Sequence, residues 1–170
     1  MKKQIKYPSL ISRLFATTLD LSLLCIILHP IMNLVSKYLF KLIFLDFFIK
    51  YESAQENFSS IMQITQMPEF LPYATNKSFI IYSILVLLIN ILIMAGYFIG
   101  FWIYISATPG KFMMSTKIVD AVTFEKPTNR QFIKRFFFSF FFFVGIWFIQ
   151  FTKQRQALHD KMSGTLVIKK

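Results

Sequence analysis

Three apolar blocks, separated by polar and basic segments, constrain the fold of this chain more than any other feature. The blocks cover roughly residues 14–35, 79–107 and 132–151. A helix that spans a bilayer needs about 20 predominantly apolar residues, and the first two blocks reach that length. The sequence therefore predicts an all-α integral membrane protein with two transmembrane helices.

The third apolar block is shorter, and basic residues flank it on both sides. It offers roughly sixteen apolar residues, fewer than a full span needs. It is either a short third span or a re-entrant or interfacial hairpin that turns near Gly145. Two short β-prone stretches, 117–119 and 165–168, can pair on the cytoplasmic face only if the chain returns there after the block. We favour the return, with a small cytoplasmic β pairing.

The basic residues of this chain follow the pattern of a membrane protein. Lysine and arginine number 19 against 8 acidic residues, a formal charge of +11. These cations flank the apolar blocks and form no stripe of the kind that binds nucleic acid. The positive-inside rule places the N-terminus, the 108–130 loop and the C-terminus in the cytoplasm, and segment 51–78 outside. The anionic inner leaflet is then an expected partner of the basic flanks.

The ends of the first helix are marked by local signals. We expect it to begin after Pro8, with Ser9 or Ser12 as its N-cap. His29-Pro30 should weaken or kink its far half, because proline removes a backbone donor. Aromatic residues are mixed with charged ones over 36–50, which indicates a continuation that lies at the outer interface.

The second helix is predicted over about 78–107. Gly96 and Gly100 form a G-x-x-x-G motif within it, which lets another helix backbone approach closely. We therefore predict a helix-packing role for these two glycines. The preceding segment 51–78 shows no usable periodicity.

Asp20 interrupts the first apolar block. A carboxylate at membrane depth costs about 2.5–3.5 kcal/mol on insertion scales, so it persists where it is paired or used. Arg13 lies on nearly the same helix face, but about 10.5 Å away along the axis. Its side chain also leans toward the helix N-terminus, away from Asp20. We expect Asp20 to find its partner on another helix, with Lys134, Arg135 and Arg155 as candidates.

Two polar motifs lie outside the apolar blocks. Thr108-Pro109-Gly110-Lys111 predicts a tight turn that ends the second helix, with Lys111 at the membrane surface. Its spacing differs from that of a phosphate-binding loop. His159-Asp160 stands before Gly164, and we interpret Asp160 as an N-cap or salt-bridge acceptor at a turn.

The sequence gives little support for catalysis. Cys25 is the single cysteine, and no H-E-x-x-H or Cys/His ligand set is present, so a metal site has no supporting motif. An enzyme acting on a lipid or phosphate would rest on His159-Asp160 alone. We predict a protein that is not an enzyme and has no cofactor or metal.

Several of these motifs together resemble the RDD family of small bacterial membrane proteins, which is named for one arginine and two aspartates. The resemblance rests on Arg13 with Asp20, on 108–111 followed by 117–120, and on 155–161 with Gly164-Thr165. It implies one membrane domain over residues 8–170 in the bacterial inner membrane. It assigns the arginine to Arg13 and the aspartates to Asp20 and Asp160, with Asp120 as the alternative for the second.

Two functions remain open. Transport, including cation/proton exchange, has been suggested for members of the family, and it would use Asp20 as a titratable or cation-coordinating group. Three short helices do not easily enclose a route, so transport requires a homo-oligomer or a membrane partner. The alternative is a binding and assembly module that contacts anionic lipid. The charge network predicted for either function comprises Arg13, Asp20, Lys111, Arg155, His159 and Asp160.

Overall fold

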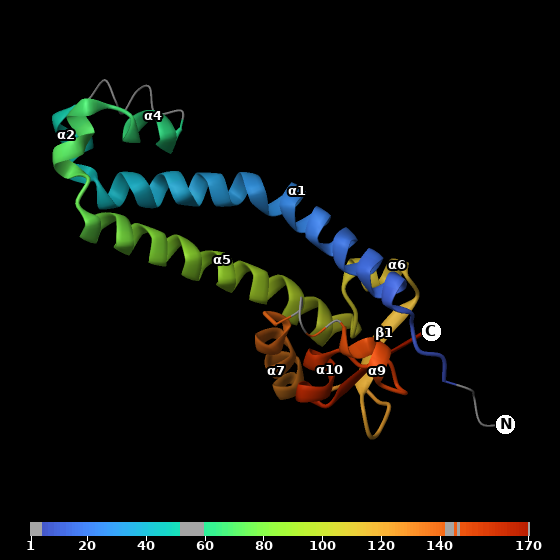
Figure 1. Cartoon of the computed structure of the whole chain (residues 1–170). Coiled ribbons are helices and arrows are strands. Elements are labelled where there is room, and N and C mark those ends of the chain that lie inside the picture. Colours follow the sequence, from blue (N-terminus) through green and yellow to red (C-terminus); the bar gives the residue numbers. More distant parts are fainter. Residues whose placement is uncertain (1–4, 52–59, 142–144, 146, 170) are drawn as a thin grey trace. The chain divides into compact units, whose positions relative to one another are not determined.

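The computed structural model describes residues 5–51, 60–141, 145 and 147–169 (Figure 1). Its contacts divide the chain into two compact units. Unit 1 comprises Met1–Cys25 and Met94–Lys170, and unit 2 comprises Ile26–Ile93. The single domain expected over residues 8–170 stays a prediction.

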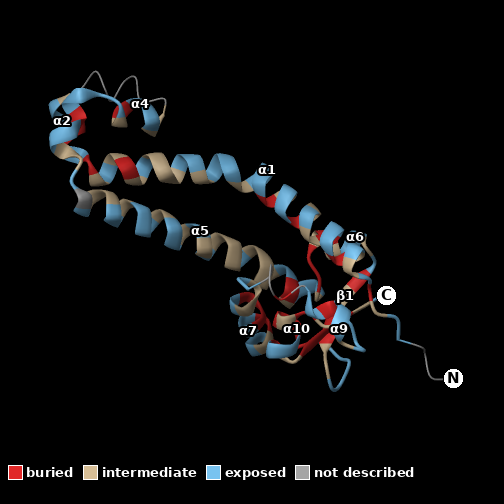
Figure 2. Ribbon diagram, in the orientation of Figure 1, coloured by how far each residue is buried: buried red, intermediate tan, exposed pale blue. Residues whose placement is uncertain are grey.

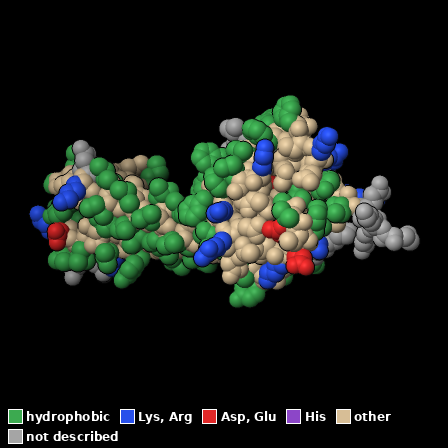
Figure 3. Space-filling view, turned by 90° about the horizontal axis from the view of Figure 1, so that it is seen from below, with side chains coloured by type: hydrophobic (Ala, Val, Ile, Leu, Met, Phe, Trp, Pro, Cys, Tyr) green, Lys and Arg blue, Asp and Glu red, His purple; other side chains and the backbone are tan. Residues whose placement is uncertain are grey.

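Two long helices dominate the fold. Helix α1 covers Leu10–Ile43 and helix α5 covers Asn76–Ile105, and both are long and apolar enough to cross a membrane. Only 17% of the most apolar stretch of α1 is buried, and none of that of α5. The α5 side chains seen in Figure 3 are largely hydrophobic, and Figure 2 shows exposed and intermediate residues along this helix. A soluble core helix would bury its apolar face, so both are candidate membrane-spanning helices.

The start of α1 follows the predicted signal. The hydroxyl oxygen of Ser9 accepts a hydrogen bond from the backbone N–H of Ser12 at 3.2 Å. Such a bond satisfies one of the amides that a helix leaves unpaired at its N-terminus. Ser9 is thus the capping residue of the two candidates. The helix continues through Pro30 to Ile43.

Unit 2 contains an aromatic core at the C-terminal end of α1. Helix α2 (Leu45–Lys50), helix α4 (Ile61–Thr65) and the 3-10 helix η1 (Pro68–Tyr73) follow α1. Segment 60–75 therefore holds two short helices, although its sequence lacks periodicity, because its apolar residues pack against the aromatic end of α1. The rings of Phe44 and Phe70 are 5.0 Å apart. The buried members of this core are Phe40, Phe44, Phe47, Phe48, Ile64 and Phe70.

Among the described residues, unit 1 contains the sheet and four short helices. Strands β1 (Thr116–Asp120) and β2 (Thr165–Lys169) pair antiparallel, with Thr116 opposite Lys169 and Asp120 opposite Thr165. The predicted pairing of the two β-prone stretches is confirmed. The helices of this unit are α6 (Pro109–Met113), α7 (Asn129–Ser139), α9 (Phe148–Phe151) and α10 (Leu158–Ser163).

The third apolar block forms two short helices where it is described. Helix α7 has 11 residues and α9 has 4, each too short to span a bilayer. The beginning of the block packs inside unit 1, where the rings of Trp102 and Phe132 are 6.1 Å apart. Its end packs there too, since Ile149 is buried with Ala157. Most of the predicted turn near Gly145 lies outside the described residues.

The G-x-x-x-G motif of α5 has no close neighbour among the residues that the structure describes. Among the described residues, no atom outside the local helix lies within 4 Å of a Cβ built on Gly96 or Gly100. No described segment therefore uses the close approach that these glycines permit. Their helix-packing role stays a prediction, and it would need a partner chain.

Candidate functional site

Asp20 is fully buried and accepts hydrogen bonds from three neutral donors. Its Oδ1 atom accepts from the backbone N–H of Gly110 at 2.7 Å and from the Tyr97 hydroxyl at 3.4 Å. Its Oδ2 atom accepts from the Thr108 hydroxyl. Hydrogen bonds of this kind to a carboxylate are stronger than those between neutral groups. Asp20 therefore ties α1 to the turn between α5 and α6.

The sequence of that turn explains the contact. Thr108 is the N-cap of α6, and Pro109 follows it at the first helical position, where the absence of an N–H is tolerated. Gly110 then presents an unpaired backbone N–H to the carboxylate of Asp20. A side chain at 110 would collide with α1, since a Cβ there would lie 2.1 Å from the carbonyl oxygen of Ala16.

The predicted cationic partners of Asp20 are wrong. Within the described part of the chain, no lysine or arginine nitrogen lies within 4.0 Å of its carboxylate, so Lys134, Arg135 and Arg155 are not ion-paired with it. The physical reason is that Thr108 and Gly110 of the α5–α6 turn, together with Tyr97 of α5, already supply three donors. The charge network predicted from the sequence is therefore two separate groups in the structure. One is Asp20 with its hydrogen-bond donors, and the other is a cluster of ion pairs around a second carboxylate.

Asp160 is the centre of that second cluster and is fully buried. Its Oδ2 atom pairs with the Nη1 of Arg13, and its Oδ1 atom lies 2.6 Å from the Nη1 of Arg135. Its Oδ2 also accepts the backbone N–H of Ala157 at 3.1 Å, at the start of α10. This geometry confirms the interpretation of Asp160 as a salt-bridge acceptor at a turn, which ends at Gly164 with φ of 66°.

The two arginines have further partners that fix their positions. The Nη2 of Arg13 donates to the backbone carbonyl of Arg155 at 2.6 Å. The Nη1 of Arg135 donates to the hydroxyl of Thr165 at 2.5 Å, and its guanidinium carbon lies 5.5 Å from the centre of the Trp102 ring. Arg155 thus contributes its carbonyl oxygen, while its own side chain is exposed.

Burial and charge shift the ionisation of this cluster. Burial by itself would raise the pKa of the Asp160 carboxyl. The positive charges of Arg135 and Arg13 lower this pKa by a larger amount, so it stays well below its usual range. Burial, reinforced by the charge of Arg135, lowers the pKa of Lys111 to about 8. Burial also lowers the pKa of His159 to about 3, so this imidazole is neutral at physiological pH.

The His159 shift predicts a loss of stability in mild acid. Below its ordinary pKa of 6.5 the unfolded chain gains a proton that the folded chain does not bind, so stability falls as pH decreases toward 3. We expect a loss of roughly 2–3 kcal/mol between pH 6.5 and 4.5, at 1.36 kcal/mol for each pH unit. The free energy of unfolding in detergent micelles, measured at both pH values, tests this.

The matched variant is His159→Gln, which removes the titrating group and keeps a polar side chain. Its stability should change much less over the same interval. The lowered pKa of Asp120, about 2, acts only at more acidic pH than this interval. If the free energy of unfolding changed equally with pH in the variant and in the wild-type chain, the loss of stability could not be assigned to His159.

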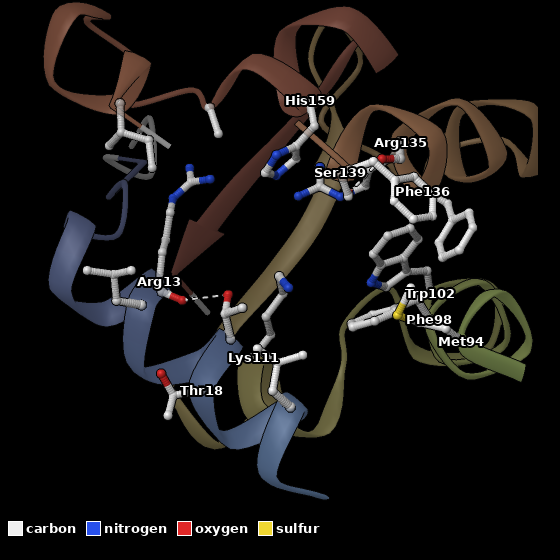
Figure 4. Close-up of a pocket in the computed structure, with 16 residues that line it drawn as sticks. Arg13, Thr18, Met94, Phe98, Trp102, Lys111, Arg135, Phe136, Ser139 and His159 are labelled. Carbon is white, nitrogen blue, oxygen red and sulfur yellow. Dashed lines mark hydrogen bonds between the residues drawn. The ribbon is translucent and has the colours of Figure 1, made fainter. Parts of the chain in front are cut away.

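A cavity of about 500 Å³ lies beside the Asp160 cluster in unit 1 (Figure 4). Arg13, Lys111, Arg135 and His159 form its polar wall. The remaining wall is mainly aromatic and aliphatic and includes Trp102. Its apolar members include Leu14, Leu21, Met94, Phe98, Phe136 and Phe140.

Sequence reasoning found part of this site and missed part of it. Of the predicted network, Arg13, Lys111 and His159 line the cavity, and Asp160 binds Arg13. Arg135 was considered only as a partner of Asp20, and Trp102 was missed. Arginine is scarce in this lysine-rich chain, with four in all, and two of them bind Asp160. That scarcity was the available signal for Arg135, whereas Trp102 had none.

These features define a mostly helical protein with two candidate membrane-spanning helices, a small two-stranded sheet and a buried Arg/Asp cluster. The model of the RDD family matches residues 7–164. The chain therefore belongs to the RDD family. It is 44% identical over 173 residues to the uncharacterized protein RP437 of Rickettsia prowazekii (strain Madrid E), with 99% of each chain covered. No solved structure matches it.

Proposed function

We propose that this chain is a non-catalytic membrane module for binding and assembly, held together by its buried charge network. The observation that carries the proposal is the double pairing of Asp160, whose carboxylate binds Arg13 of α1 and Arg135 of α7. Arg13 and Asp160 are 147 residues apart in the sequence. One buried carboxylate thus joins the first candidate span to the C-terminal elements.

The proposed location is the bacterial inner membrane, with both termini in the cytoplasm. The basic flanks of α1 and α5 support this orientation. The packing of α7 and of Ile149 within unit 1 supports a third block that returns to the side it came from. Unit 1 would then lie at the inner surface of the membrane, where anionic lipid is present.

The contacts of Asp20 favour assembly over transport. Its two oxygens accept from Thr108, Gly110 and Tyr97, so the carboxylate serves as an anchor for the α5–α6 turn. Transport of a small solute or ion, including cation/proton exchange through an oligomer, would instead require this carboxylate to release its donors and bind a proton or cation. The two functions therefore differ in what Asp20 does.

The Asp20→Asn variant tests this difference. An asparagine keeps one carbonyl oxygen for Gly110 but loses the charge, so we expect a loss of about 1–3 kcal/mol in the free energy of unfolding. We expect no cation-dependent proton flux in proteoliposomes from either the wild-type chain or the variant. A pH-sensitive dye inside the vesicles measures that flux.

The control is Asp46→Asn, a charge removal on α2 outside this site. Wild-type flux that persists in Asp46→Asn and disappears in a folded Asp20→Asn protein would overturn the assembly proposal in favour of transport. Absence of flux, together with the stability loss confined to Asp20→Asn, is the expected result.

A further inference from the structure

The cavity beside Asp160 gathers nitrogen donors from four elements. Figure 4 shows the nitrogen-bearing ends of Arg13, Lys111, Arg135 and Trp102 directed toward one central space. They come from α1, α6, α7 and α5, so no single turn or helix end creates this arrangement. His159 of α10 lines the same wall.

Several donors of this wall are buried without an acceptor in the part of the chain that the structure describes. Among the described residues, no hydrogen-bond partner is found for the Nε of Arg13, the Nε of Arg135 or the indole Nε1 of Trp102. Arg135 and Trp102 are only 1% and 3% exposed. Buried donors in folded proteins nearly always have partners. A ligand that supplies acceptor oxygens would satisfy them.

The charge balance of the wall also favours an anion. Arg13, Lys111 and Arg135 carry three positive charges, and Asp160 offsets one of them. Asp20 also faces Lys111, and counting both carboxylates still leaves one positive charge in excess. Within the described part of the chain, no carboxylate oxygen lies within 4.0 Å of the Lys111 ammonium. Lys111 is therefore the cation of this wall with the greatest freedom to bind a ligand.

The rest of the cavity is suited to hydrocarbon. Its apolar walls include Leu14 and Leu21 of α1 and Phe140 beyond α7, which are 41%, 48% and 50% exposed. These residues belong to the first and third apolar blocks, so on the proposed topology they face lipid. A ligand with an acyl chain can leave that chain among the apolar residues while its charged end enters the cavity.

We propose that this cavity binds the phosphate group of an anionic phospholipid, with Arg13, Lys111, Arg135 and Trp102 as donors and the acyl chains lying along the apolar wall. Phosphate oxygens accept hydrogen bonds from several directions, which matches donors placed on four elements, and guanidinium groups suit phosphate geometry. A metal cation is disfavoured by the excess positive charge. The inference rests on the proposed membrane placement and names the ligand of that module.

The test uses the full chain in nonionic micelles with Trp147→Phe as the background. The chain has two tryptophans, and Trp147 is 60% exposed and does not line the cavity, so Trp102 becomes the fluorescent reporter. The probes are dihexanoyl phosphatidylglycerol, dihexanoyl phosphatidylcholine and inorganic phosphate. We expect a saturable change in Trp102 emission with phosphatidylglycerol only.

Lys111→Gln and Lys134→Gln form the matched pair of variants. Each removes one positive charge, but Lys134 is exposed on α7 and does not line the cavity. Losing one charge-assisted hydrogen bond should weaken phosphatidylglycerol binding about tenfold in Lys111→Gln. Lys134→Gln should bind within about twofold of the background protein, because an exposed charge contributes little. Circular dichroism establishes that both variants are folded.

Each other outcome overturns the proposal. Equal binding by Lys111→Gln and Lys134→Gln would mean general charge attraction. Equal binding of phosphatidylcholine would remove the requirement for an anionic headgroup, and equal binding of inorganic phosphate would make this a site for a free anion. The assembly proposal has separate tests in the flux of Asp20→Asn and the stability of Asp160 variants, so the two can fail independently.

Discussion

Replacing Asp160 by asparagine is expected to destabilise the folded chain by about 3–5 kcal/mol, the usual loss when one partner of a buried ion pair is removed. The neutral amide would leave Arg13 and Arg135 facing each other with their charges uncompensated. Both guanidiniums are buried, at 8% and 1% exposed, so water cannot easily replace the lost carboxylate. The free energy of unfolding in mixed detergent micelles measures the effect.

Asp120→Asn is the matched control for that variant. Asp120 accepts from the side chain of Gln131 at 2.5 Å and from the backbone N–H groups of Val122 and Thr123, and no cation pairs with it among the described residues. Its loss should therefore cost about 1 kcal/mol. The comparison also separates the two candidates for the second family aspartate. Equal losses in the two variants would contradict a special role for Asp160.

Gly110→Ala is the second substitution with a large expected effect. The new Cβ would lie 2.1 Å from the carbonyl oxygen of Ala16 and 3.0 Å from the Cγ of Asp20. The carbonyl on α1 and the turn that carries residue 110 are both parts of the backbone, so no side chain can rotate to remove the clash. The clash is removed only if α6 moves away from α1, which breaks the hydrogen bond between Gly110 and Asp20. We expect a loss of about 3 kcal/mol or more in the free energy of unfolding, from overpacking together with that bond.

Gly96→Ala is the control for Gly110→Ala. A Cβ at this position in α5 meets no atom within 4 Å among the described residues. Alanine is favoured over glycine inside a helix by about 1 kcal/mol, so this variant should be slightly stabilised. Destabilisation of Gly96→Ala would instead indicate a partner helix against the G-x-x-x-G motif. Similar behaviour of the two variants would contradict the packing described for Gly110.

Local signals account for the parts of the fold that sequence could predict. The two long helices follow from uninterrupted apolar runs, and α5 at 76–105 differs from the predicted 78–107 only at its ends. Ser9 marks the start of α1, and the two β-prone stretches pair as expected. The short helices α4 and η1 were not predicted, because their apolar residues become ordered by contact with phenylalanines distant in sequence.

The sequence predicted the residues of the site better than it predicted the hydrogen bonds and ion pairs between them. Arg13 and Asp160 were both singled out, but the sequence joined them only through a family pattern. Asp20 was expected to pair with a cation, yet its donors are two hydroxyls and one backbone N–H. A backbone N–H leaves no mark in a sequence, so Gly110 could be read as a turn residue but not as a partner of Asp20.

The sequence by itself determined the two apolar helices, the two strand segments and the membership of the RDD family, since each depends on residue types that follow one another along the chain. Only the tertiary structure decided which charges meet. Arg13 and Asp160 lie 147 residues apart, and Asp160 gains Arg135 because α7 packs beside α10. Burial makes an unpaired charge costly, so the pairing of these groups depends on which of them the packed elements bring within hydrogen-bonding distance.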